Sequence, residues 1–333
     1  MLKNIVVLLA VSLPAICYAA ASAPIDTRSE FARPHQMVDI GGRRLNLYCS
    51  GAGPVTVVFD APSSDAGWNR SDVQPAVATR TRACVYDRAG FGFSDPSPRP
   101  GTSGNAVNDL HKLLGAAGIA PPYVMVGSSY GGANVQLYTY RYPSEVKGLV
   151  LIEAQHEDET ARVNKATNGK MAEVQAMFDQ LETACLAQSE KGFVQGSELQ
   201  ANCVGDGYAD FGRALGAARL AQNLSPVYRR ARHSEESNFN VGNGELRAAR
   251  RPFGDLPLIV LVRGVSPFAV PGKPQSALNK ALEDENLAMQ KEIAALSTRS
   301  ELRVVPGASH IIHDKRPDAV IKAVADLLAQ VER

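Results

Sequence analysis

The chain has 333 residues, of which 45% are hydrophobic and 21% charged, so it can bury a large core and has the composition of an ordinary globular protein. Its 35 basic residues nearly balance 34 acidic ones, which leaves a formal net charge of +1 at pH 7. Because no long run of Lys or Arg accompanies this balance, the composition argues against disorder and against nucleic acid as a partner.

The first 23 residues have the layout of a secretory signal peptide. Lys3 precedes an apolar stretch over residues 5–16, and a cluster of small residues follows at 19–23. The apolar stretch is shorter than the roughly 20 residues that a membrane-spanning helix needs. We therefore expect residues 1–23 to be removed on export, and the mature chain to be periplasmic or secreted without stable membrane insertion.

The cysteines fit an exported protein. Cys17 lies in the predicted signal peptide, and its removal leaves four of the five cysteines, namely Cys49, Cys84, Cys185 and Cys203. An even count in an exported chain predicts two disulfides, and the count leaves three pairings open. A zinc site is not expected, because no C-x-x-C motif or His cluster accompanies the cysteines.

Short apolar segments alternate with helical ones through the first half of the chain. Residues 35–40 and 44–49 flank Gly41-Gly42 and predict a hairpin. Further strands are predicted at residues 55–59, 83–86, 123–126 and 148–152, with helices at 105–117 and 132–142. This alternation favours a largely parallel sheet with helices on both faces.

The second half begins with a change of character. From about residue 155 to residue 251 the sequence is polar, charged and helical, with no clear strand. Strands return at residues 257–262 and 301–305, with helices at 277–296 and 317–331. We therefore expect residues 24–154 and 252–333 to form one α/β core, into which residues 155–251 are inserted as a helical cap.

The segment Gly127-Ser128-Ser129-Tyr130-Gly131 carries the candidate nucleophile. It matches G-x-S-x-G between a predicted strand and a predicted helix, which is the setting of a nucleophile elbow. The glycines are required because the strained turn that holds Ser129 leaves no room for flanking side chains. The alternative interpretation is a glycine-rich turn without chemistry.

A serine hydroxyl is a weak nucleophile and needs a base. His310 follows the last predicted strand and precedes the closing helix, and proteins with a nucleophile elbow place their base in such a loop, after the serine in chain order. His313, three residues further on, is the alternative. We favour His310 because of its position.

Several segments resemble the α/β-hydrolase superfamily: residues 57–62, Trp68, residues 86–94, the elbow at 127–131, and Ser309-His310 onward. The resemblance covers about residues 38–154 and 257–333, and it implies the α/β-hydrolase fold, a mostly parallel central sheet flanked by helices, with an inserted helical cap. Residues 86–94 resemble proline-iminopeptidase-like, haloalkane-dehalogenase-like and esterase members alike, so they indicate the fold rather than the substrate.

The resemblance also implies an oxyanion hole of two backbone N–H groups. One belongs to Tyr130, the residue after the nucleophile. The other comes from the loop after the third strand, where Pro62 has no N–H to donate. Ala61 is therefore the favoured second donor, with Ser63 as the alternative.

The acid of the triad departs from the commonest pattern of the superfamily. Many members place an Asp after the strand that corresponds to residues 257–262, and this chain has Ser266 there. Some members place the acid after the preceding strand, where this chain has Glu153. A carboxylate there leaves the sheet at the same edge as Ser129, so it can fix the tautomer of the base. The alternatives are that Glu153 only caps its strand or pairs with a cap Arg, and that the acid is Asp158, Glu283 or Asp284.

The resemblance further implies a disulfide pairing. The second and fourth strands of this superfamily are usually neighbours, which places Cys49 beside Cys84. Cys185 would then pair with Cys203 within the cap.

The implied reaction is hydrolysis of a small-molecule substrate through an acyl-enzyme, with no metal or organic cofactor. A carboxylic ester is the first expected substrate, because ester leaving groups demand least of the site. An amide or peptide is the second, and a catalytically silent binding protein on the same fold is a third reading. Ser129 argues against dehalogenase and epoxide-hydrolase chemistry, which use a carboxylate nucleophile. The sequence makes no prediction of oligomeric state.

Overall fold

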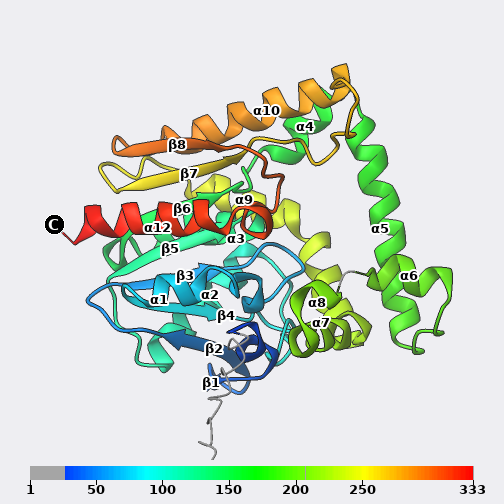
Figure 1. Ribbon diagram of the computed structural model, residues 1–333, viewed down its shortest axis with the longest axis horizontal. Helices are drawn as coiled ribbons and strands as arrows, with labels where there is room; N and C mark the ends of the chain where they lie inside the picture. The colour runs from blue at the N-terminus through cyan, green and yellow to red at the C-terminus, as the bar shows by residue number, and fades with distance from the viewer. Residues whose placement is uncertain (1–26, 207, 333) are drawn as a thin grey trace, which may run out of the picture.

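A computed structural model describes residues 27–206 and 208–332. Its centre is an eight-stranded sheet in the order β1-β2-β4-β3-β5-β6-β7-β8 (Figure 1). β1 pairs with β2 and β2 with β4 in antiparallel fashion, and every later pairing is parallel. The strands are β1 Gln36–Asp39, β2 Arg44–Ser50, β3 Thr56–Asp60, β4 Arg82–Tyr86, β5 Tyr123–Ser128, β6 Val146–Ile152, β7 Leu258–Arg263 and β8 Ser300–Val305. The predicted parallel α/β sheet is therefore confirmed.

The central strands are buried along their whole length. β3 and β5 have no exposed residue, which explains why they read as continuous apolar runs rather than as alternating ones. Successive side chains nevertheless enter different cores: Val57 and Phe59 face one hydrophobic cluster, and Val58 faces the other. The sheet is thus a buried layer whose strand ends are held rigidly.

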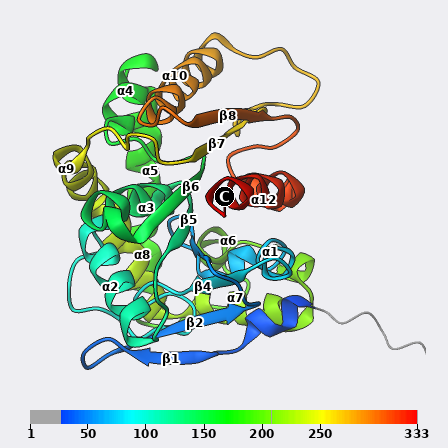
Figure 2. The same cartoon turned by 90° about the vertical axis from the view of Figure 1, so that its left-hand side faces the viewer.

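Helices cover both faces of the sheet (Figure 2). One face packs against α1 Gln74–Ala78 and α12 Pro317–Val331, and the other against α2 Ser103–Ala116, α3 Tyr130–Arg141 and α10 Ala277–Ala294. The remaining short elements are α11 Ile312–Lys315 and the 3₁₀ helices η1 Thr27–Ala32, η2 Gly67–Arg70, η3 Pro143–Glu145 and η4 Tyr208–Phe211. The chain has the α/β-hydrolase arrangement that the sequence predicts.

Between β6 and β7 the chain leaves the sheet and forms only helices over the described residues. These are α4 Glu159–Ala166, α5 Lys170–Ser189, α6 Glu198–Val204, α7 Arg213–Leu224, α8 Pro226–Ser237 and α9 Phe239–Ala249. α9 packs on α2 and α3, and α4 packs on α10, whereas α5 and α6 extend beyond the sheet (Figure 1). The division into a core and a cap at residues 155 and 251 stays a prediction.

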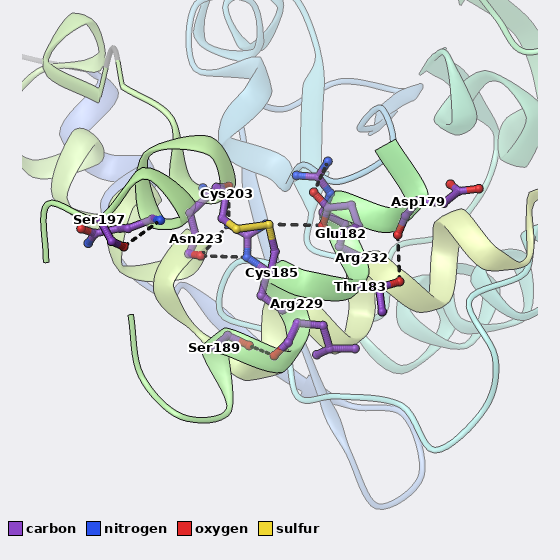
Figure 3. The surroundings of a disulfide bond; sticks show 12 residues. Asp179, Glu182, Thr183, Cys185, Ser189, Ser197, Cys203, Asn223, Arg229 and Arg232 are labelled. Carbon is purple, nitrogen blue, oxygen red and sulfur yellow. Dashed lines mark hydrogen bonds and ion pairs between the residues drawn. A yellow bond between two sulfur atoms is a disulfide. The ribbon is translucent and has the colours of Figure 1, made fainter. Parts of the chain in front are cut away.

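The structure contains both predicted disulfides. Cys49 and Cys84 are register partners on the neighbouring strands β2 and β4, and their Cα atoms lie 4.1 Å apart. Cys185 of α5 is bonded to Cys203 of α6 (Figure 3). The predicted signal peptide and Cys17 lie outside the described residues. In the described part of the chain, no helix is long and apolar enough to cross a membrane.

Candidate active site

Ser129 sits on a sharp turn between β5 and α3. Its backbone has φ = 50° and ψ = −120°, a conformation that is unfavourable for a residue with a side chain. A Cβ atom on Gly127 would lie 2.3 Å from the carbonyl oxygen of Gly131, and one on Gly131 would lie 2.4 Å from that of Ala61. The glycines are therefore needed for space, as the sequence predicts, and the turn has the geometry of a nucleophile elbow.

Two cavities meet at Ser129. One, of about 360 Å³, is lined by Ser129, His310 and residues of the loop that follows β3, among them Pro62 and Ser63. The other, of about 570 Å³, extends from Ser129 between α4, α5 and the start of α9, with Glu159 and Phe239 in its wall. A substrate can thus reach the hydroxyl, and the helices between β6 and β7 shape the space that it would occupy.

His310 and Glu153 are in contact. His310 follows β8, Glu153 follows β6, and the Nδ1 atom of the imidazole lies 3.3 Å from Oε2 of the carboxylate. The Glu153 side chain is buried, whereas that of His310 is 36% exposed and faces the cavity that Ser129 lines. The structure therefore brings together the three side chains predicted as nucleophile, base and acid.

Besides His310, two further residues hold the carboxylate of Glu153. Oε1 accepts hydrogen bonds from the backbone N–H of Arg263 at 2.8 Å and from Nδ2 of Asn286 at 3.3 Å, and Oε2 is ion-paired with the Arg263 guanidinium. Burial raises the pKa of the Glu153 carboxyl, but the His310 hydrogen bond and the Arg263 charge outweigh it, so that the pKa lies below its ordinary value. Glu153 is consequently ionised at neutral pH.

The sequence missed Arg263 and Asn286. Arg263 directly follows the strand predicted at residues 257–262 and ends β7, beside β6 in the sheet, so its position at the strand end was a signal for it, whereas Asn286 lies within α10 and had none. The alternative that Glu153 pairs with a cap Arg is wrong in its detail, because its arginine partner belongs to β7 and Glu153 also contacts His310.

The other candidates for the acid have different partners. Asp158 pairs with Arg247, Glu283 with Arg263 and Asp284 with Lys280, and the Ser266 hydroxyl donates to Asn279 Oδ1. Of the four candidate carboxylates, Glu153 alone lies within hydrogen-bond distance of His310.

The loop after β3 lies directly against the elbow, as the close approach of Gly131 to Ala61 shows. Arg88 holds this loop by donating to the carbonyl oxygens of Ala61 and Pro62, both at 2.8 Å. The buried Arg88 also pairs with Asp60 and with Glu235 of α8, so it connects the sheet to the inserted helices. Tyr130, the residue after Ser129, begins α3, and the carbonyl of Ala61 lies against Gly131, whereas the roles of the Tyr130 and Ala61 N–H groups stay predictions.

His313, in contrast to His310, is buried. Its side chain is 2% exposed, and neither ring nitrogen has a hydrogen-bond partner, although Nε2 lies 3.5 Å from Asp314 Oδ1. Burial and the nearby charge of Arg70 hold the pKa of His313 well below its ordinary value of 6.5. His313 is therefore a neutral core side chain.

This burial predicts a pH dependence of stability. Below pH 6.5 the unfolded chain binds a proton at His313 that the native chain does not. As the pH falls, His313 should therefore lower the free energy of unfolding by up to about 1.4 kcal/mol per pH unit. His313→Phe should remove that contribution. Urea unfolding of both proteins at pH values from about 5 to 7.5 checks this, and equal slopes would contradict the buried neutral state.

The sheet and the helices around it have the α/β-hydrolase fold, and comparisons with known proteins agree. The family model for the alpha/beta hydrolase fold matches residues 56–190. A 2-hydroxy-6-oxo-2,4-heptadienoate hydrolase of Pseudomonas putida is 33% identical over 126 residues, which are 36% of this chain and 44% of that protein. The uncharacterized protein YbdG of Bacillus subtilis is 27% identical over 119 residues, 35% of this chain and 37% of that protein.

Solved structures share the fold at low sequence identity. A thermophilic esterase of Thermogutta terrifontis superposes with a TM-score of 0.56 at 17% identity, covering 90% of this chain and 100% of that one. A putative acyltransferase of Salmonella enterica has a TM-score of 0.64 at 16% identity, covering 87% and 92%. The chain therefore has the α/β-hydrolase fold. Its matches to the two curated relatives named here span less than half of their length.

Proposed function

We propose that the protein is an exported serine hydrolase that cleaves a carboxylic ester through an acyl-enzyme on Ser129. The observation that carries the proposal is the arrangement of three side chains: Ser129 on a strained elbow shares a cavity with His310, and His310 contacts the buried Glu153. A carboxylate at Nδ1 favours the tautomer with the proton on that atom, which leaves Nε2 free to accept the serine proton.

In the proposed reaction His310 removes the proton from Ser129 Oγ as the oxygen attacks the ester carbonyl. The backbone N–H groups of Tyr130 and Ala61 stabilise the oxyanion of the tetrahedral intermediate. His310 then gives its proton to the departing alcohol, and water, activated by the same imidazole, releases the acid from the acyl-enzyme. Glu153 remains ionised throughout and compensates the imidazolium.

Two further observations support export. The N-terminal residues have the pattern of a signal peptide, and the described chain contains two disulfides, which persist in oxidising compartments. In this proposal residues 155–251 form the cap that sets specificity, since residues of α4 and α5 line the larger cavity.

A panel of p-nitrophenyl esters of increasing acyl length, with aminoacyl p-nitroanilides beside them, tests the substrate class. Ester hydrolysis that is abolished in the Ser129→Ala variant supports the proposal. Hydrolysis of anilides in preference to esters would replace it with an amide hydrolase. No turnover of either series by the folded protein would favour a binding protein on this fold.

Glu153→Gln should lower kcat by about 10²–10⁴-fold, as neutralisation of a triad acid does, because the amide cannot compensate the imidazolium. The change also leaves Arg263 with one carboxylate partner fewer, so stability should be followed by thermal unfolding. Glu283→Gln, which removes the other partner of Arg263, is the matched control and should leave kcat within a fewfold of wild type. A Glu153→Gln enzyme with near-normal kcat would assign the role of the acid to another group.

A further inference from the structure

Arg70 is buried beneath the nucleophile elbow. It ends η2, and only 1% of its surface is exposed. Nη2 donates a hydrogen bond of 2.5 Å to the hydroxyl of Ser128, the residue immediately before Ser129, and Nη1 donates to Asn69 Oδ1 at 2.7 Å. Nε has no acceptor. The guanidinium is therefore bonded to the elbow, and its partners are both neutral.

No carboxylate pairs with this cation in the described part of the chain. Other buried arginines differ: Arg88 pairs with two carboxylates, and Arg229 lies 3.5 Å from Glu182. The link from Arg70 to Asp65 runs through Asn69, whose Nδ2 donates to Asp65 Oδ2 at 2.9 Å. Burial lowers the pKa of Arg70 to about 10, although the charges of Asp65, Asp314 and Asp60 act in the opposite direction.

A buried charge without a counter-ion in contact is unfavourable for stability, and an apolar side chain would fill the same space without this penalty. The same charge becomes favourable when negative charge develops nearby, because a weakly polar interior screens it little. His313 is close enough to Arg70 for the arginine charge to lower its pKa, so it stays neutral and adds no second positive charge there. The arrangement is thus costly in the resting protein and useful when an oxyanion forms beside Ser129.

We propose that Arg70 is a positioning residue: through its bond to Ser128 it fixes the elbow, and its charge, which no carboxylate contacts among the described residues, stabilises the transition state for attack by Ser129. This inference rests on the proposed acyl-enzyme function. The inference predicts a lower kcat with little effect on KM. The charge acts at a distance on negative charge that develops only in the transition state, and Arg70 makes no contact with the substrate as it binds.

The first test compares Arg70→Gln with Arg70→Lys on the p-nitrophenyl ester that the wild type cleaves fastest. Gln keeps hydrogen-bonding capacity but removes the charge, and it should lower kcat by about 10- to 50-fold with KM within about twofold. Lys keeps the charge and should recover most of kcat. The rate at which a fluorophosphonate labels Ser129 should fall in parallel with kcat.

A second pair keeps Arg70 in place, in case its removal prevents folding. Ser128→Asn and Ser128→Asp add side chains of nearly equal size against Arg70, but only Asp neutralises its charge. Ser128→Asp should have a kcat at least about tenfold below that of Ser128→Asn. Arg229→Gln, at another fully buried arginine whose partners lie in the inserted helices, is the control (Figure 3). It should lower Tm without lowering kcat.

The outcomes separate the two proposals. If the wild type is neither labelled nor active, the proposed function fails. Suppose instead that the wild type is labelled and active, but kcat falls only in proportion to Tm in all variants. If, in addition, Arg70→Gln has the same kcat as Arg70→Lys, or Ser128→Asp the same kcat as Ser128→Asn, then Arg70 is only structural and this inference is wrong.

Discussion

Ser129→Ala should lower kcat for ester hydrolysis by about 10⁴–10⁶-fold and leave a folded protein, because it removes the only covalent nucleophile of the proposed mechanism. The substitution deletes one oxygen atom at a site that borders two cavities, so the packing of the core is unaffected. Initial rates on a p-nitrophenyl ester and thermal unfolding measure the two effects.

Ser266→Ala is a suitable control for that variant. Ser266 occupies the position where many superfamily members carry their acid, but its hydroxyl bonds to Asn279 and does not contact His310. Its loss should leave kcat within a fewfold of wild type. Near-normal activity of Ser129→Ala would refute the acyl-enzyme mechanism.

His310→Ala should reduce kcat by a comparable factor, about 10⁴-fold or more, because the serine then lacks the base that accepts its proton. The imidazole is partly exposed to the cavity that Ser129 lines and contacts Glu153, so its removal leaves that cavity without the proposed base. KM should change little, since the imidazole acts on the proton rather than on substrate binding.

His313→Ala provides the comparison within the same loop. The substitution opens a cavity in a buried site and should therefore lower Tm. Below its unfolding temperature the variant should keep kcat within about tenfold of the wild type, because His313 affects the site only through neighbouring packing. The opposite ranking of the two histidine variants would make His313 the base.

Much of the fold could be predicted from the sequence because its signals are local. The central strands of the sheet are short apolar runs. The elbow is a contiguous motif, and its glycines are needed because backbone atoms approach them closely. The short helix α1 was not predicted, since five residues carry too little periodicity.

The electrostatic surroundings of the site could not be predicted in the same way. Glu153 meets Arg263 from β7 and Asn286 from α10, and Arg88 from the segment after β4 meets Glu235 from α8. Such partners are distant in sequence and are chosen by tertiary packing. A buried charge needs a hydrogen-bond or ion-pair partner, but which residue supplies it is visible only in the three-dimensional structure.

Labelling with a fluorophosphonate probe, followed by peptide mass spectrometry, tests the central claim that Ser129 is an activated nucleophile. The folded wild type should be labelled stoichiometrically on the peptide that contains Ser129, and Ser129→Ala should remain unlabelled. Absence of labelling in the folded wild type, or a label that remains on another serine in the variant, would contradict it.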